Sequence, residues 1–444
     1  MRQQLHITIL GGGPAGLAVG YYARKSGIPF TLYEAAERVG GNCSTFRQGD
    51  YLFDSGAHRF HDKNPEVTKE ILQLMGDDLL KISVPSQIYH RGRFIDFPLS
   101  PFDLMKKLGP VTFTKSGFDL IGSRLKGRRR EEHFENFAVY TYGREMADRF
   151  LLNYSEKLWG FPCSRLSPQI SGKRMKGLNL KTFLKETFLG NQAKTEHLDG
   201  YFYYPKFGYG MIADRLAEYA GRDNIKTAAR ITKILHKDDR IEAIEVNGGN
   251  RQSVQEIVNT LPLSLFLTMM QPAFPEEILK TVKDMRFRHV ILVALFINKR
   301  TITPNGSVYF PDPEFPFTRV YEPKNRSPHM APEGKTSLVA EIPCFTDDAN
   351  WRRSDGELIE AVQKKLIEVG WMKESEITGA GVYRLYNAYP VLSLGFEKKI
   401  ETVMTYLGRF SNLKLSGRGG KFIYSWLHDM MQFGHDIVAE YRAI

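Results

Sequence analysis

The chain has 444 residues, 42% of them hydrophobic, and carries a formal net charge of +11. This length exceeds what one simple hydrophobic core supports, so we expect two domains built from interleaved segments. No apolar run approaches the roughly 20 residues that span a bilayer, and three scattered cysteines form neither a disulfide framework nor a metal site. We therefore expect a cytoplasmic globular protein without a bound metal.

Residues 6–16, HITILGGGPAG, form a short apolar run that breaks into glycines and leads into the helix-like stretch LAVGYYARKSG. The glycines have the G-x-G-x-x-G spacing that lets a backbone approach a pyrophosphate at a helix N-terminus. A second apolar strand, PFTLY, ends at Glu34, where a ribose-binding carboxylate is expected. The pattern predicts a dinucleotide-binding unit whose cofactor contacts are Gly11, Gly13, Pro14, Ala15, Gly16 and Glu34.

Two further glycine-rich segments indicate which dinucleotide this unit binds. The loop after Glu34 contains Arg38 and the pair Gly40-Gly41, which permit a bidentate phosphate contact and close backbone approach. Residues 417–420 read GRGG. Together these motifs resemble the extended FAD signature of the family of FAD-dependent amine oxidases, protoporphyrinogen oxidases and UDP-galactopyranose mutases. The resemblance implies FAD as the cofactor, with further contacts from Arg38, Gly40, Gly41, Asn42, His58, Ile231, Gly417 and Arg418.

The segments between these motifs differ in type. Residues 66–195 carry long amphipathic stretches typical of helices, and residues 201–216 indicate an aromatic strand, a glycine turn and a helix. The short runs RITKIL, RIEAIEV and QEIVNTL predict a hairpin and a return to the first sheet. Residues 286–345 again indicate strands, followed by the helix ELIEAVQKKLIEVG, and the chain ends as strand, glycine loop and helix.

We therefore predict an α/β fold with a Rossmann-like FAD-binding domain, an interleaved substrate domain of mixed sheet, and a mainly helical insertion. The FAD-binding domain is expected at residues 1–65, 205–262 and 405–444, the helical insertion at 66–204, and the substrate-domain sheet at 263–404.

Four downstream strings resemble UDP-galactopyranose mutases more specifically. They are GAHRFH at 56–61, YSEKLWG at 154–160, PFTRVYE at 316–322 and AYPV at 388–391. In that family, reduced flavin attacks the anomeric carbon of a UDP-sugar while arginines hold the diphosphate. The resemblance implies catalytic roles for His58, Arg319 and Tyr389, and substrate-binding roles for Tyr154, Trp159, Arg319 and Tyr389.

Several of these residues also suit a purely structural role in the fold. Tyr154 and Trp159 also suit an aromatic core, and Arg319 also suits an ion pair with Glu322 in its own strand. Nothing in the sequence assigns a role to Asp54 or Glu341.

One departure from the mutase pattern decides our preferred function. Where the mutases present a diphosphate-clamping arginine, this chain has a longer loop with Lys176 and Lys181 instead. The aromatic run at 201–204 also suits an apolar substrate. We therefore favour an FAD-dependent oxidoreductase of oxidase, desaturase or dehydrogenase type, acting on a small-molecule or lipid-linked substrate. The alternative is a flavin-dependent mutase of UDP-sugars in surface-polysaccharide synthesis.

The positive charge has two further interpretations. No nucleic-acid-binding motif accompanies it, and the cluster at 126–130 is followed by Glu131 and Glu132, as on a solvated helix face. The mixture of apolar and basic residues at 100–130 leaves a peripheral membrane contact as an open alternative.

Overall fold

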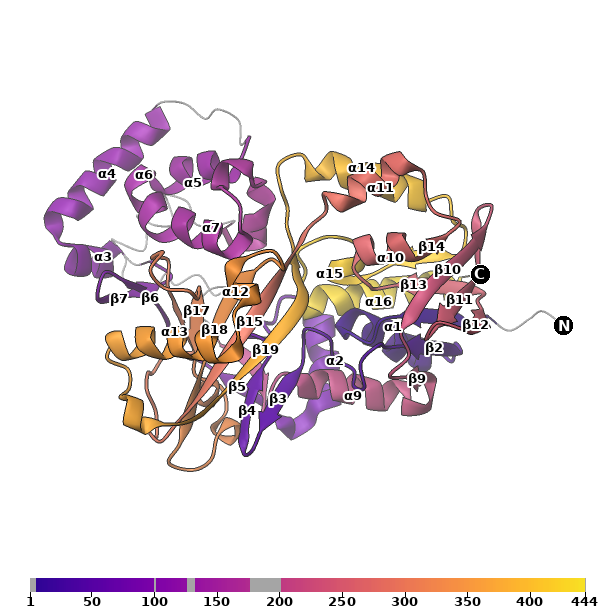
Figure 1. Ribbon diagram of the computed structural model, residues 1–444, viewed down its shortest axis with the longest axis horizontal. Helices are drawn as coiled ribbons and strands as arrows, with labels where there is room; N and C mark the ends of the chain where they lie inside the picture. The colour runs from indigo at the N-terminus through magenta and orange to yellow at the C-terminus, as the bar shows by residue number, and fades with distance from the viewer. Residues whose placement is uncertain (1–4, 100, 126–131, 176–200, 444) are drawn as a thin grey trace.

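The computed structural model of the protein describes residues 5–99, 101–125, 132–175 and 201–443 (Figure 1). A five-stranded parallel sheet, in the order β20-β13-β1-β2-β9, joins distant parts of the chain. Its strands are β1 (Ile7–Leu10), β2 (Phe30–Tyr33), β9 (Ile225–Lys226), β13 (Glu256–Asn259) and β20 (Leu413–Leu415). The predicted return of QEIVNTL to the first sheet is confirmed, because β13 pairs with β1.

Three helices accompany this sheet. Helix α1 (Pro14–Lys25) packs on β1 and β2 and is itself contacted by α9 (Gly210–Ala220) and α16 (Leu427–Arg442). Every residue of β1 is buried, as is typical of a parallel strand covered on both faces. Helices α1 and α16 approach closely at Gly434, where an added Cβ would lie 2.8 Å from the carbonyl carbon of Ala18. Only glycine fits this crossing without a backbone shift.

The predicted hairpin is also confirmed and forms a second sheet, in the order β12-β11-β10-β14. Its strands are β10 (Ile231–Lys237), β11 (Arg240–Val246), β12 (Asn250–Ser253) and β14 (Met270–Gln271). Helix α10 (Leu263–Met269) packs on β10, and α11 (Glu276–Lys283) packs between α10 and α14 (Phe396–Leu407).

The largest sheet has seven strands in the order β19-β15-β18-β17-β16-β6-β7. Four of these were predicted from residues 286–345, namely β15 (Phe287–Ile297), β16 (Ser307–Tyr309), β17 (Arg319–Tyr321) and β18 (Thr336–Cys344). The long strand β19 (Ile377–Pro390) was not predicted. Helix α13 (Asp355–Glu368) covers one face through Leu358, Val362 and Leu366, and a capping box of Ser354 and Glu357 starts the helix. The pair β3 (Thr45–Gln48) and β4 (Tyr51–Asp54) packs on the other face, where Phe53 and Tyr321 share a core.

The hairpin of β6 (Ser86–His90) and β7 (Arg93–Phe97) lies within the segment for which mainly helix was predicted. It joins the seven-stranded sheet because β6 pairs in parallel with β16, more than 200 residues later. Strand β5 (Leu79–Ile82) likewise pairs with β8 (Phe202–Pro205). The aromatic strand predicted within 201–216 is thus confirmed as β8, whereas β5, β6 and β7 were not predicted, because their partners in the sheets are remote in sequence.

The remaining helices of this region are α2 (Pro65–Met75), α3 (Pro101–Leu108), α4 (Pro110–Leu125), α5 (Phe134–Tyr142), α6 (Arg144–Ala147) and α7 (Asn153–Trp159). Figure 1 shows α4 at the outer edge of the molecule, and its helical neighbours are α3, α5 and α6. None of the helices in the described ranges has the length and apolar character needed to cross a membrane.

Candidate functional site

The N-terminus of α1 is built around three glycines with different constraints. Gly11 has a φ of +101°, and an added Cβ there would lie 2.6 Å from Oγ1 of Thr260. An added Cβ on Gly16 would lie 1.9 Å from the Gly11 carbonyl oxygen, so this glycine is required for packing. Gly13, the N-cap of α1, has no described atom within 4 Å of such a Cβ. The helix N-terminus is therefore open at Gly13, with no side-chain cap in the described structure.

Two more glycine segments converge on the same helix end. The Gly40 N–H donates to the Gly12 carbonyl oxygen at 2.9 Å, and an added Cβ on Gly41 would lie 3.2 Å from Cα of Gly13. From the C-terminal part of the chain, an added Cβ on Gly417 would lie 2.5 Å from Cβ of Ala15. The three segments leave backbone N–H groups and a positive helix end without bulky side chains around them. This cradle fits a dinucleotide pyrophosphate.

The other predicted cofactor contacts surround this cradle. Glu34, at the end of β2, accepts hydrogen bonds from Gly12 N at 2.7 Å and Ala36 N at 2.8 Å. Arg38 is exposed and donates to the Thr45 carbonyl oxygen at 3.1 Å, and Asn42 donates to the Asn387 carbonyl oxygen at 3.3 Å. Ile231 is 8% exposed and is the first residue of β10. In sequence it shortly follows the residues whose backbones hydrogen-bond to the chain at the end of β2.

His58 lies in the loop after β4, in a strongly basic environment. Its Nε2 is 3.1 Å from Oγ of Ser55, and its ring stacks on Tyr209 with the centroids 4.9 Å apart. Burial, reinforced by Arg319, Arg418 and Arg326, lowers the pKa of His58 to about 3. The imidazole is therefore neutral across the physiological pH range.

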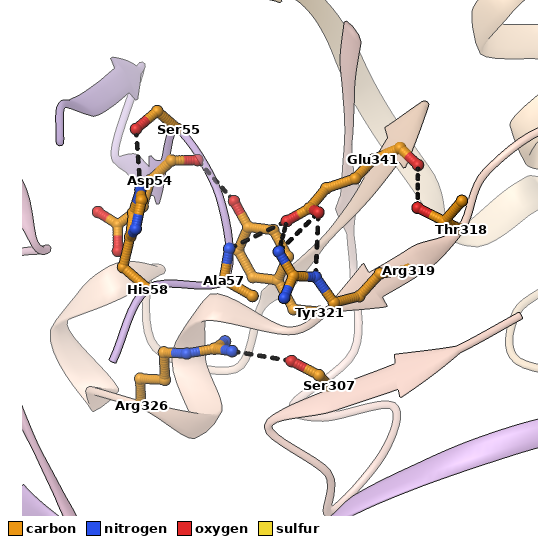
Figure 2. Close-up of polar contacts among 10 residues, drawn as sticks. All are labelled: Asp54, Ser55, Ala57, His58, Ser307, Thr318, Arg319, Tyr321, Arg326 and Glu341. Atoms are coloured by element: carbon orange, nitrogen blue, oxygen red, sulfur yellow. Dashed lines mark hydrogen bonds and ion pairs between the residues drawn. The ribbon is translucent and has the colours of Figure 1, made fainter. Parts of the chain in front are cut away.

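Arg319 pairs with Glu341 and not with Glu322, so the predicted ion-pair partner was wrong. Figure 2 shows the two side chains meeting across adjacent strands, with Nε and Nη2 of Arg319 within 3.0 Å of the carboxylate oxygens. Glu322 instead accepts hydrogen bonds from backbone N–H groups of Ile302 and Thr303. Burial opposes the charge of Arg319, yet Glu341 holds its pKa above the usual value.

Glu341 also connects this ion pair to the loop that carries His58. Its Oε1 accepts a hydrogen bond from the backbone N–H of Ala57 at 3.0 Å, so one carboxylate fixes both Arg319 and residue 57 (Figure 2). Asp54 anchors the start of the same loop, because its carboxylate accepts hydrogen bonds from Tyr204 OH at 2.6 Å and Tyr209 N at 2.9 Å.

The predicted aromatic residues gather around the two arginines. Tyr154, Tyr309 and Tyr389 each interact electrostatically with Arg319, whose guanidinium lies 6.0 Å from the ring centroid of Tyr309. The guanidinium of Arg418 lies over the rings of Tyr389 and Tyr424, at 5.4 and 5.1 Å from their centroids. It is fixed there by hydrogen bonds to the carbonyl oxygens of Ala388 and Ser425. Trp159, which is 4% exposed, packs edge-on against Tyr389 and belongs to the core.

The helix that carries Tyr154 and Trp159 is held in place by two cations, of which Arg288 is buried and Lys157 is partly buried. Arg288 donates to the carbonyl oxygens of Lys157 and Leu158 at the end of α7 and pairs with Asp348. Lys157 donates to the carbonyl oxygens of Phe310, Asp312 and Phe317, and burial lowers its pKa to about 8. The structure thus brings Tyr154, Arg319, Tyr389, Arg418 and His58 into one region.

Sequence reasoning missed the acidic residues of this region. Asp54 had a usable signal, because it stands four residues before His58 and directly after the apolar run YLF at 51–53. Glu341 had a weaker one: it is the direct cross-strand partner of Arg319 in the antiparallel pair of β17 and β18. Finding it required the strand register. Lys176 and Lys181, in the loop that departs from the mutase pattern, lie outside the described residues.

Comparisons with known proteins agree with this architecture. Residues 14–375 match the family described as flavin containing amine oxidoreductase. Coproporphyrinogen III oxidase of Bacillus subtilis is 23% identical over 430 residues, which cover 89% of each chain. Chloroplastic protoporphyrinogen oxidase of Oryza sativa subsp. japonica is 23% identical and covers 92% of this chain and 83% of its own length.

Among solved structures, reduced UDP-galactopyranose mutase has a TM-score of 0.87 at 18% identity, covering 99% of this chain and 96% of its own. That likeness shows the fold. The family match covers well over half of the chain and includes α1, the loop at 38–42, the His58 loop and the Arg319–Glu341 pair, whereas Gly11, Gly13 and Gly417 lie outside the matched residues. The chain therefore belongs to the flavin-containing amine oxidoreductase family.

Proposed function

We propose that the protein is an FAD-dependent oxidoreductase that oxidises a small-molecule substrate. The observation that carries the proposal is the convergence of three glycine segments on the open N-terminus of α1. A mononucleotide flavin has no pyrophosphate to place there, whereas FAD does. We assign the pyrophosphate to the N-terminus of α1, flanked by the loops at 38–42 and 417–418, and the ribose to Glu34. Ile231 lines the adenosine end.

When bound, the flavin supplies the electron-accepting chemistry, and the protein supplies binding, orientation and exclusion of water. Arg418 is suited to orientation, because carbonyl oxygens and two tyrosine rings fix its guanidinium. Burial raises the pKa of Tyr389 to about 12, so its hydroxyl stays protonated and can donate a hydrogen bond to substrate. His58 is a neutral contact residue and carries no proton between substrate and solvent, because its pKa is about 3.

The substrate class follows from the residues around Arg319. Tyr154, Tyr309 and Tyr389 offer aromatic surface, and Arg319 offers a cation whose charge Glu341 already offsets. This combination favours a substrate with aromatic or unsaturated rings that also carries an anionic or polar edge. Coproporphyrinogen III, named for the Bacillus relative, is the first substrate to test.

A second candidate is a flavin-dependent mutase of UDP-sugars. The close fold similarity to UDP-galactopyranose mutase favours it, as does the grouping in this chain of Tyr154, Arg319 and Tyr389, which stand in the strings that resemble the mutases. Against it, the loop predicted to clamp the diphosphate offers Lys176 and Lys181 where the mutases have an arginine.

One anaerobic experiment separates the candidates. The purified holoprotein is first extracted with acid, and the released flavin is identified by chromatography and mass; we expect FAD. Oxidised holoprotein is then mixed with coproporphyrinogen III or UDP-galactopyranose while the flavin absorbance is followed. An oxidoreductase loses flavin absorbance in proportion to substrate and recovers it with an electron acceptor. Sugar isomerisation that requires dithionite-reduced flavin, without net flavin oxidation, would instead establish the mutase.

An Arg319→Met variant serves as the functional control. It removes the cation from the substrate region but leaves the cradle at α1 intact, so FAD content should be unchanged while KM rises at least tenfold. Loss of FAD together with activity would show that Arg319 acts on the fold and not on substrate.

A further inference from the structure

Helices α3 and α4 expose an apolar face that no other described element covers. Val111, Phe118 and Leu125 are 81%, 71% and 82% exposed, and they recur every seven residues on one side of α4. Ile121 of α4 and Met105 of α3 are also exposed. We call these five residues the α3–α4 face.

The opposite side of α4 is already used for packing. Phe113 packs with Leu104, Leu108 and Phe150 in a small core, and the Ser116 hydroxyl donates to the Thr112 carbonyl oxygen within the helix. The helix is thus apolar on two sides, whereas a surface helix of a globular protein is normally polar on its outer side. Figure 1 shows this outer side at the edge of the molecule, away from the three larger sheets.

The exposed charged side chains that α3 and α4 themselves present next to the α3–α4 face are basic, and Lys115 also interacts with Glu145 of α6. Lys106 and Lys115 are exposed, and Lys115 lines the same shallow hollow as Val111 and Phe118. The acidic groups of the two helices face other partners, because Asp103 accepts a hydrogen bond from Asp96 N and Asp119 accepts one from Glu145 N. An apolar surface flanked by lysines has the composition of a helix that lies in the interface of an anionic membrane.

We propose that the α3–α4 face binds the surface of an anionic phospholipid bilayer, with α4 lying in the interfacial plane. A second copy of the chain fits less well, because a two-fold contact through this face would bring the lysines of both copies into one interface. The 16 described residues of α4 are fewer than the roughly 20 apolar residues that span a bilayer. This surface is remote in the chain from the cradle residues at α1, and the proposal does not depend on the substrate.

The test is flotation of full-length holoprotein with vesicles of phosphatidylcholine alone or of phosphatidylcholine with phosphatidylglycerol. We expect binding to the anionic vesicles and its loss at high salt. Phe118→Ser should weaken binding at least tenfold, and Lys115→Glu at least about fivefold, since one lysine near such a surface contributes about 1 kcal/mol. Leu394→Ser, at a residue that is 50% exposed elsewhere, and Lys364→Glu on α13 are the matched controls and should bind like wild type.

Circular dichroism and flavin content show that each variant is folded; both replaced side chains are exposed. Three outcomes overturn the proposal. They are equal flotation with both vesicle types, anionic binding that Phe118→Ser and Lys115→Glu leave unchanged, and absence of binding from wild type. A dimer in light scattering that Phe118→Ser dissociates, without vesicle binding, would assign the face to a second copy instead.

Discussion

Replacing Glu341 tests whether the buried ion pair supports the candidate site. The side chains of Arg319 and Glu341 are 15% and 7% exposed, so Glu341→Gln leaves a guanidinium charge with little access to water. Removing one partner of a buried pair costs about 3–5 kcal/mol, and Coulomb's law gives about 4 kcal/mol at ~4 Å with an effective dielectric constant of about 20. We therefore expect the free energy of unfolding to fall by about 3 kcal/mol or more.

The assay is denaturant unfolding of the flavin-free protein, followed by circular dichroism, for Glu341→Gln, Arg319→Gln and the double variant. The double variant has no buried charge and should recover about 2 kcal/mol or more relative to the sum of the single changes. Glu368→Gln, which breaks the more exposed pair with Lys365, is the control and should cost less than about 1 kcal/mol. Additive effects of the two single changes would refute the assignment of Arg319 and Glu341 as one energetic unit.

Three further predictions concern the cradle, His58 and the thiols. Gly13→Ala should leave the free energy of unfolding of the flavin-free protein within about 1 kcal/mol of wild type but weaken FAD binding at least tenfold, as measured by titration. The control, Gly356→Ala at the start of α13, should change neither quantity. Unaltered FAD affinity of Gly13→Ala would show that the cradle is not part of the cofactor site. Below pH 6.5 the His58 side chain takes up a proton in the unfolded state but, with a pKa near 3, not in the folded state. Between pH 6 and 4 the free energy of unfolding of wild type should therefore fall by up to about 1.4 kcal/mol per pH unit more than that of His58→Gln, as measured by denaturant unfolding. Parallel pH dependences of the two proteins would contradict a neutral imidazole in the folded state. Burial raises the pKa of each cysteine thiol to about 12, so a thiol reagent at pH 8 should label the native protein slowly and the unfolded protein rapidly; fast native labelling would disprove this. The residues concerned are Cys43, Cys163 and Cys344.

Local patterns were sufficient for the cofactor end of the fold. The order of strand, glycine turn, helix and strand at residues 6–34 is encoded within neighbouring residues, and the structure forms it as β1, α1 and β2. The hairpin of β10 and β11 is equally local, and both were predicted for this reason. The hairpin of β6 and β7 was not, because its place in the sheet depends on β16.

The candidate site shows the same division. Tyr154, Arg319 and Tyr389 were selected because each stands in a distinctive string, and the structure places them together. Glu341 stands in the continuous apolar strand TSLVAEIPC, where a single acid has no local meaning. Its function as a partner arises from the register of two strands and from the loop that brings Ala57 to it. Such contacts are properties of the assembled fold.

The parallel sheet beside α1 also constrains when the protein can acquire its cofactor. Its first strand begins at Ile7, but its edge strand β20 and the glycines at 417–420 are made about 400 residues later. A nascent chain therefore emerges from the ribosome with the glycine motif of α1 already synthesised and the other wall of the cradle still missing. Flavin incorporation is therefore expected only after the segment at 413–420 has emerged, and a chain cut before Leu413 should not retain flavin after purification.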